Sequence, residues 1–271
     1  MCCNRKIVTF VGRSITHSTM NRLFHLLAVA EFAICGVSAQ ALRSEQILHE
    51  NWRFHRGDAA GAEKPEFDDR SWQTVAIPHD WAITGPFSRD CDLQKVAVKQ
   101  NGESVATWKT GRTGGLPYAG VGWYRTTFEA PVEGRTTLVF DGAMSEAHVY
   151  VNGTEAIFWP YGYNSFYVDV TSLLEADGKP NTLAVRLENR EQSSRWYCGA
   201  GLYRNVRLVH TSNVHVAVWG AQVTTKLIPG AGAAVTVRYT MDNAEGKTLL
   251  RNARNDEGFA INSSILGIIL E

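Results

Sequence analysis

The strongest constraint on this chain is a series of short segments with alternating apolar and polar residues, about ten residues apart. They lie at 123–128, 136–140, 147–151, 156–159, 165–170, 181–187 and 205–209. Such alternation is typical of strands with one buried face, and Asn152-Gly153 between two of them is a strong hairpin signal. The spacing predicts an all-β antiparallel sandwich. Short helical turns are expected only at 67–72 and 171–174.

A second group of strand-like segments follows at 214–218, 222–225 and 235–240. It resembles the opening of an immunoglobulin-like sandwich, a fold that needs about seven strands and about 100 residues. Fewer than sixty residues follow Ser212, and the alternation ends near Leu250. We therefore expect a complete sandwich over 42–212 and an incomplete immunoglobulin-like β-sandwich with an aberrant tail over 213–271.

Residues 1–41 are predicted to be a signal peptide region. Met20-Asn21-Arg22 is a charged start, residues 23–36 are mostly apolar, and the small residues of 38–41 suit signal peptidase. The apolar run is short and interrupted for a bilayer span, so a membrane anchor is the less favoured alternative. A signal peptide normally begins at its own methionine, which makes Met20 the predicted start.

Secretion through this segment predicts a periplasmic or extracellular protein. Without the first 41 residues, Cys91 and Cys198 are the cysteines that remain. In an oxidising compartment they would either form one disulfide or stay as two thiols. The sequence leaves both alternatives open.

The composition argues against several classes of partner and cofactor. Lys+Arg and Asp+Glu both number 27, so the formal net charge is zero. Nucleic acids and acidic membranes require a basic surface, and neither is expected here. The sequence has no Cys/His spacing for zinc, no phosphate-binding loop and no Ser/His/Asp signature. We expect no metal and no cofactor.

Several motifs together resemble the N-terminal sugar-binding domain of glycoside hydrolase family 2, the β-galactosidase and β-glucuronidase family. They are FDDRSW at 67–72, IPHDW at 77–81, GWYRTTF at 122–128, HVYVNG at 148–153 and WYCGAGLYRNV at 196–206. The loop KTGRTGGLPY at 109–118 is similar to the secreted β-galactosidase branch of that family. The resemblance covers residues 48–212.

The resemblance implies a jelly-roll (galactose-binding-like) sandwich, then an immunoglobulin-like domain, then a catalytic (β/α)8 barrel. Family members are retaining enzymes that use two glutamates on the barrel. A barrel takes about 250 residues, so we expect no catalytic residue in this chain. Glu188-Asn189 reverses the order of the family's Asn-Glu pair, and we interpret it as a solvated strand end.

The candidate substrate-binding residues are aromatic and planar polar groups in loops. They are Arg195, Trp196, Tyr197, Arg112, Tyr118 and Asp80. Aromatic faces suit the C–H faces of sugar rings, and planar polar groups suit their hydroxyls.

Each of these residues also has a structural alternative. Trp196 would fill the core while Arg195 pairs with an acid, and 111–118 would be a plain surface hairpin rather than a mobile lid. Trp81 would pack in the core while Asp80 bonds to the backbone. Many relatives carry Asp where Arg195 stands, so the family's sugar or sodium contact is not transferred. This charge reversal favours an anionic or differently hydroxylated sugar.

The leading interpretation is the carbohydrate-binding portion of a secreted family 2 enzyme of β-galactosidase type, which hydrolyses O-glycosyl bonds with retention. Its partners would be a galactoside-like glycan and the missing catalytic domain, and the chain alone would be inactive. Two alternatives are a stand-alone carbohydrate-binding module and a non-functional product of a truncated or split gene.

Overall fold

The computed structural model describes residues 5–13, 43–91, 93–109, 119–175, 179–191, 199–228 and 232–243. The chain divides into two compact units, Arg43–Thr211 and the combination of Met1–Leu42 with Ser212–Glu271. The regular elements of the described residues are strands and 3-10 helices, with no α-helix, so the predicted all-β class is confirmed. Among these residues, no helix has the length and apolar character to cross a membrane.

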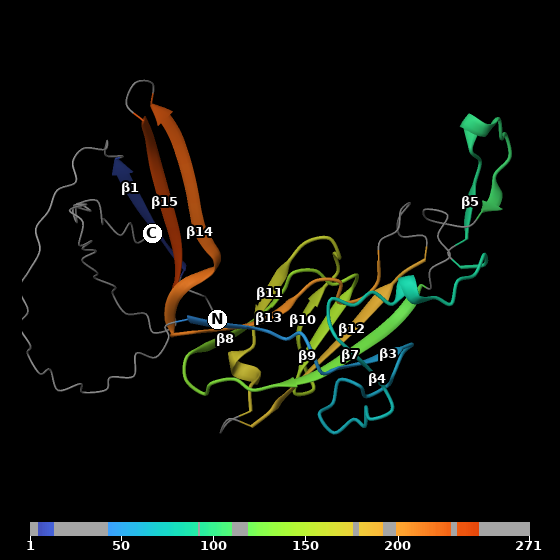
Figure 1. Ribbon diagram of the computed structural model, residues 1–271, viewed down its shortest axis with the longest axis horizontal. Coiled ribbons are helices and arrows are strands. Elements are labelled where there is room, and N and C mark those ends of the chain that lie inside the picture. The colour runs from blue at the N-terminus through green and yellow to red at the C-terminus, as the bar shows by residue number, and fades with distance from the viewer. Residues whose placement is uncertain are drawn as a thin grey trace, which may run out of the picture. The chain divides into compact units, whose positions relative to one another are not determined.

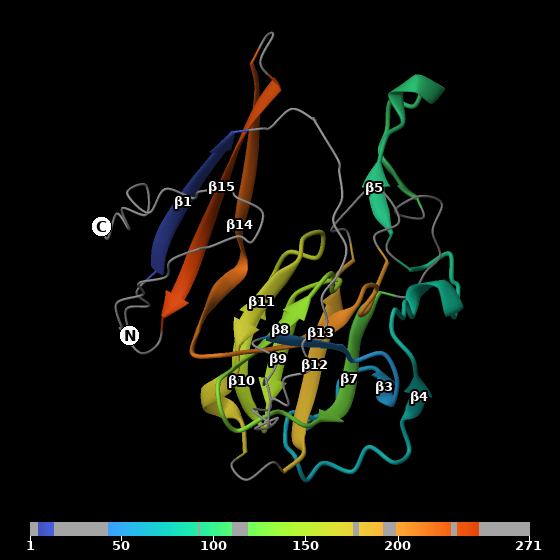
Figure 2. The same cartoon turned by 60° about the vertical axis from the view of Figure 1, so that its left-hand side comes forward.

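The unit Arg43–Thr211 is a sandwich of two antiparallel sheets (Figures 1 and 2). The first sheet has the order β10-β9-β12-β7-β3-β4, with bounds Thr154–Trp159, Ala147–Val151, Asn181–Asn189, Gly120–Phe128, Trp52–Arg56 and Gln73–Val75. The second has the order β11-β8-β13-β2, with bounds Phe166–Asp169, Arg135–Phe140, Val206–Thr211 and Arg43–Ile47. The predicted jelly-roll sandwich is therefore confirmed.

Shorter elements occupy the connections of this unit. Strands β5 (Gln94–Val96) and β6 (Thr107–Lys109) pair as a small separate sheet. The 3-10 helices are η1 (Ala82–Thr84), η2 (Lys99–Asn101) and η4 (Thr171–Leu173). The last of these confirms the helical turn predicted at 171–174.

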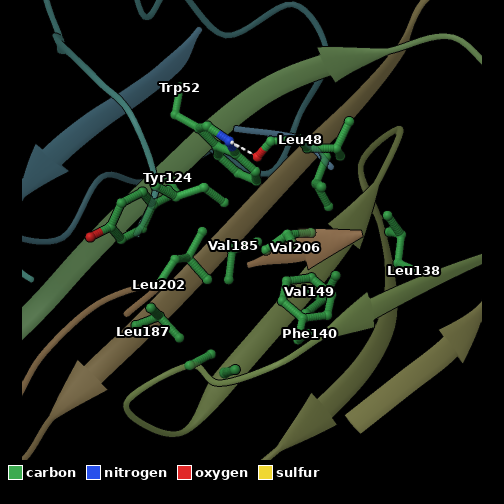
Figure 3. Packing of buried hydrophobic residues seen from close by; sticks show 14 of the residues in the cluster. Leu48, Trp52, Tyr124, Leu138, Phe140, Val149, Val185, Leu187, Leu202 and Val206 are labelled. Atoms are coloured by element: carbon green, nitrogen blue, oxygen red, sulfur yellow. Dashed lines mark hydrogen bonds between the residues drawn. The ribbon is translucent and has the colours of Figure 1, made fainter. Parts of the chain in front are cut away.

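The main core fills the space between the two sheets (Figure 3). Trp52, Tyr124 and Phe140 are each fully buried. The indole N–H of Trp52 donates to the carbonyl of Leu48 over 2.9 Å, so its one polar group is satisfied inside the core. Strand β9 alternates buried and partly buried residues along its whole length, as its sequence pattern predicts.

A second, smaller core lies on the outer face of the first sheet. Strand β12 begins with five consecutive buried residues rather than an alternating pattern, because this outer face is also covered. The cover is the β3–β4 connection, which packs Ala62 and Trp72 against Trp123 and Ala184. The sequence of a central strand that is covered on both faces has a continuous apolar run instead of alternation.

Arg125 fastens this connection to the sheet. Its side chain is 4% exposed and its Nε donates to Asp69 over 2.8 Å. The guanidinium also donates to the carbonyls of Ala62 and Lys64 and lies over the Phe67 ring. A buried cation is tolerated where its donors are satisfied in this way.

The Asn152-Gly153 hairpin forms as predicted between β9 and β10. Both residues have positive φ, 50° and 81°, which the tight primed turns require. Asn152 also donates to the Leu173 carbonyl and to Asn181 Oδ1, and it accepts the amide of Thr182. The turn residue therefore also joins the start of β12 to η4.

The helical turn predicted at 67–72 is wrong, because this segment contains no helix. Asp68 Oδ1 accepts the Arg70 amide over 3.1 Å, which closes a local turn, and the Asp69 carbonyl accepts the amide of Trp72. Asp69 also turns its carboxylate to Arg125. Side chains that bond to nearby backbone in this way favour turns over helices.

The other unit contains a three-stranded sheet in which β15 (Gly232–Asn243) lies between β1 (Arg5–Arg13) and β14 (Val214–Ile228) (Figure 2). The separate strands predicted at 214–218 and 222–225 are one strand, β14, with a register shift between Val216 and Ala221. Trp219 has φ of 56° within this irregularity, where a bulge joins the two predicted segments.

Strand β1 is not anticipated by the sequence analysis, although IVTFV within it is rich in β-branched residues. It pairs with β15 along its full length, from Arg5 opposite Asp242 to Arg13 opposite Ala234. It lies before Met20, so a start at Met20 would remove it. The signal peptide and the boundaries 1–41, 42–212 and 213–271 stay predictions, and residues 14–42 lie outside the described part of the chain.

Replacement of Arg125 by Ala is expected to destabilise the sandwich by about 3 kcal/mol, because it leaves a carboxylate and two carbonyls without their buried donor. Urea unfolding followed by tryptophan fluorescence measures this loss. Arg70→Ala is the matched control, since Arg70 pairs with Asp68 on the exposed surface of the same connection, and its unfolding midpoint should match that of the wild type. Equal midpoints for all three proteins would contradict this role of Arg125.

Candidate functional site

Two of the loops chosen from the sequence begin at the same end of the six-stranded sheet. Gly120, the first residue of β7, pairs with Asn189, the last residue of β12. The loop 110–118 leads into β7, and 192–198 follows β12. Because the strands are antiparallel neighbours, the bases of both loops lie side by side.

A third loop reaches this end through Trp81. Its indole is fully buried and packs on Gly122 of β7, where a Cβ atom would lie 2.6 Å from the ring. We call the meeting of segments 79–85, 119–122, 141–146 and 199–205 the loop-bearing end of the sandwich. Glycine at 122 provides the room that the ring occupies.

The segment 199–205 is held between two neighbours by backbone hydrogen bonds. On one side, the amides of His79 and Trp81 donate to the carbonyls of Leu202 and Ala200 over 2.8 and 3.0 Å. On the other, Met144 and Gly201 exchange both their hydrogen bonds, at 2.9 and 3.0 Å. A segment paired on both sides is a rigid support for the loop before it.

Asp80 joins two of these segments through its side chain. Its Oδ1 accepts the amide of Ala82 and the amide of Ala200, both over 2.9 Å. Its Oδ2 lies 3.1 Å from where a Cβ on Gly199 would stand, and Gly199 has φ of +74°. The packed Trp81 and the Asp80–backbone bond are the structural alternative raised from the sequence.

Arg56 secures the same loop from β3, a role that the sequence did not indicate. Its guanidinium donates to the carbonyls of Gly85 and Trp81 and to Thr84 Oγ1. These bonds tie β3 to the two residues that flank η1 and to its last residue. No motif marks Arg56, because it is one polar position among the alternating residues of a strand.

Beneath the loop lies a hydrogen bond of 2.7 Å between His79 Nδ1 and Tyr124 Oη. Burial lowers the pKa of His79, with the Asp80 charge opposing and the Arg56 charge adding to this effect. Burial also raises the pKa of Tyr124 well above its ordinary value. The pair is therefore a neutral contact that fixes the loop's base, rather than an acid–base couple.

The start of the loop after β12 is fixed by ion pairs. Arg190 Nη2 lies 2.5 Å from Glu146 Oε2, and Arg190 Nε lies 3.5 Å from Glu188 Oε1. Ser145 Oγ donates to the Glu188 carbonyl over 2.7 Å, and the Glu188 amide donates to Ser145 O. The predicted strand-end role of Glu188 agrees with these contacts.

Of the predicted site residues, Asp80 lies within the described part of the chain, at the loop-bearing end. Arg195, Trp196, Tyr197, Arg112 and Tyr118 lie outside it, as does Cys198. Their sugar-binding roles, and that of Asp80, stay predictions. Cys91 forms no disulfide with any described residue, so its pairing with Cys198 stays open. No group of three His, Cys, Asp or Glu side chains suited to a metal occurs among the described residues.

Comparison with protein families gives one match that covers most of the sandwich. The sequence model described as "Glycosyl hydrolases family 2, sugar binding domain" matches residues 46–212. This range begins in β2 and ends one residue after β13, so it includes every segment of the loop-bearing end.

Curated relatives are similar to this chain over most of its length. A β-galactosidase, BoGH2A of Bacteroides ovatus, is 38% identical over 224 residues, which is 80% of this chain and 24% of that protein. A putative β-glucuronidase of Formosa agariphila is 33% identical over 70% of this chain and 17% of that protein. The chain thus spans a quarter or less of these relatives' lengths.

Solved structures support the same fold. A β-glycosidase from Bacteroides vulgatus has a TM-score of 0.64 and 30% identity over 75% of this chain and 25% of that one. A glycosyl hydrolase family 2 member from Bacteroides cellulosilyticus has a TM-score of 0.57 and 35% identity over 67% of this chain and 22% of that one.

Replacement of Gly201 by Ala is expected to disrupt the loop-bearing end. Gly201 has φ of +123°, and a Cβ there would meet Tyr124 Oη and lie 2.5 Å from the His79 carbonyl. Strain and overlap together predict a loss of about 3 kcal/mol or more in the free energy of unfolding, measured by urea titration.

Gly61→Ala is the matched control, since Gly61 has φ of +83° and no atom within 4 Å of its Cβ position. It reports the backbone strain alone, about 1 kcal/mol. Equal losses for the two variants would show that the packing of Gly201 against its neighbours contributes nothing.

Proposed function

The chain belongs to glycosyl hydrolase family 2 and contains that family's sugar binding domain, and from this premise we propose that the loop-bearing end contacts a galactoside-like glycan. The observation that carries the proposal is that the bases of three loops lie together at one end of the sandwich. The pairing register of β7 with β12 and the packing of Trp81 on Gly122 bring the bases of these loops together. Loops supported by a rigid scaffold are where binding residues concentrate.

In this proposal the two loops before β7 and after β12 supply the sugar contacts. Trp196, Tyr197 and Tyr118 offer aromatic faces, and Arg195 and Arg112 offer planar donors. Asp80 is the positioning residue that holds Ala200, and with it the base of the second loop. A guanidinium at 195 extends the range of sugars to anionic ones, in keeping with the β-glucuronidases among the relatives.

We assign hydrolysis to a polypeptide portion outside these 271 residues. The relatives named for β-galactosidase and β-glucuronidase activity are at least four times longer than the matched region. Retaining hydrolysis needs two carboxyl groups about 5–5.5 Å apart across the glycosidic bond, on the barrel that the family resemblance implies. The catalytic domain that carries them would be the natural partner of this sandwich.

We also propose that the protein acts in the periplasm or outside the cell. The support is the sequence of residues 20–41, with its charged start, apolar run and small residues before position 42.

Expression of the whole reading frame in a bacterium with an intact secretory pathway tests this location. We expect mature protein in the periplasm or the medium with an N-terminus at about residue 42, determined by N-terminal sequencing. A cytoplasmic product that retains Met1 would contradict both secretion and the start at Met20. It would also retain strand β1.

Binding is tested with the full 271-residue chain by affinity electrophoresis in galactan gels and by calorimetry with methyl β-galactoside and methyl β-glucuronide. Trp196→Ala is expected to weaken binding at least about fivefold, or about 1 kcal/mol. Arg195→Ala should weaken glucuronide binding more than galactoside binding, because it removes the cation that faces the carboxylate.

Two controls accompany this experiment. Arg70→Ala removes an exposed arginine from the β3–β4 connection and should leave both affinities unchanged. The wild-type chain should release no nitrophenol from p-nitrophenyl β-galactoside. Release by the purified chain would overturn the separation of binding from hydrolysis, and an unaffected Trp196→Ala would place the sugar elsewhere.

A further inference from the structure

The loop between β10 and β11 exposes two aromatic rings. Tyr161 is 56% exposed and Tyr163 is 46% exposed. Their ring centroids lie 5.5 Å apart with the planes inclined at 57°. Between them, Gly162 is buried, so the loop turns its backbone inward and carries both rings toward solvent. Neither tyrosine belongs to the motifs on which the proposed function depends.

Side-chain hydrogen bonds at several points hold this loop in one conformation. Tyr203 Oη donates to the Gly162 carbonyl over 2.7 Å, and Ser165 Oγ donates to the Asp141 carbonyl over 3.0 Å. The indole N–H of Trp159 donates to Asn164 Oδ1 over 3.0 Å. The rings are therefore presented on a fixed support, and a ligand that meets them loses little loop entropy on binding.

The loop adjoins the loop-bearing end through direct contacts. A Cβ on Gly162 would overlap the sulfur of Met144, and Met144 pairs with Gly201. The Glu146 amide donates to the carbonyl of Pro160 over 3.3 Å. The tyrosines thus lie beside the segments that support the proposed sugar-binding loops.

The neighbourhood of the rings is polar. Burial raises the pKa of Tyr203, the charge of Arg204 opposes this, and the nearby hydroxyls of Tyr163 and Tyr161 add to it. The phenol of Tyr203 thus lies under the loop at the Gly162 carbonyl, and the next residue, Arg204, is exposed. Stable protein interfaces usually have an apolar centre of larger area. Two rings edged by hydroxyls and a guanidinium better match a sugar ring, which has a C–H face and a hydroxyl rim.

We infer that Tyr161 and Tyr163 form a second contact surface for the glycan, on which a further pyranose unit of a bound oligosaccharide packs its C–H face. This inference rests on the proposed function, because the first unit occupies the loop-bearing end. The tyrosines then make the chain favour oligosaccharides over monosaccharides. Tyr203 holds the loop, and Arg204 faces the hydroxyls of the same unit.

Calorimetry on the full chain tests this with β-1,4-galactotetraose and methyl β-galactoside as probes. Tyr161→Ala and Tyr163→Ala, singly and together, should weaken tetraose binding at least fivefold while methyl galactoside binding changes less than twofold. Tyr161→Phe keeps the ring and should stay within twofold of the wild type for both probes. Trp108→Ala is the matched control, since Trp108 is 62% exposed on β6, and both affinities should be unchanged.

The outcomes separate this inference from the function on which it rests. A wild-type chain that binds neither probe overturns the galactoside proposal and the second contact surface with it. A wild-type chain that binds both, with a double tyrosine variant that binds tetraose equally well, overturns the second contact surface alone. That result would leave another occupant for the rings, such as a following polypeptide domain. Because the substituted rings are exposed, thermal unfolding midpoints should match across all variants.

Discussion

The organisation of the loop-bearing end depends on the packing of Trp81 against glycine. The indole is fully buried, and it lies on Gly122 and close to Gly201, where any larger residue would overlap its neighbours. It stacks on Phe54 and approaches Tyr124, so one side chain connects a loop to the aromatic core of the sandwich. The backbone bonds to Ala200 and Leu202 then form at the geometry this packing sets. A loop fixed by core packing is more rigid than one fixed by surface contacts alone.

The same sheet is stabilised from its other side by a polar centre. Arg125 lies on β7 next to Tyr124, and neighbouring residues of a strand point to opposite faces of the sheet. Arg125 therefore binds the β3–β4 connection, while Tyr124 packs in the main core. This explains the runs of consecutive buried residues in β7 and β12, whose outer faces are covered as well. The ends of these two central strands are the bases of the proposed binding loops. Two strands with long buried runs therefore support the bases of these loops.

The alternating pattern predicted most of the sandwich, because each such strand buries one face against one core. The sequence prediction was wrong at 67–72, where side-chain bonds replace the expected helical turn. Asp68 accepts a backbone amide of the turn, and Asp69 pairs with Arg125. Strand β1 was missed because its partner β15 lies over 200 residues away in the sequence. The candidate sugar-binding residues were chosen as residue types in loops and stay predictions. The adjacency of the strand ends at the base of two of those loops depends on the β7–β12 register, which no local motif encodes.

The charges at the loop-bearing end suit a supporting role rather than bond cleavage. Asp80 accepts two backbone amides, and Glu146 and Glu188 both pair with Arg190. The acceptor atoms of these carboxylates are therefore occupied by backbone amides and by a guanidinium. The carboxylates of the described residues here are thus committed to holding loops in place. In the proposed function, aromatic rings and guanidinium groups contact the sugar, and such contacts require no change in protonation. Under that proposal the sandwich orients the sugar, and the reacting carboxylates belong to the catalytic domain proposed as its partner.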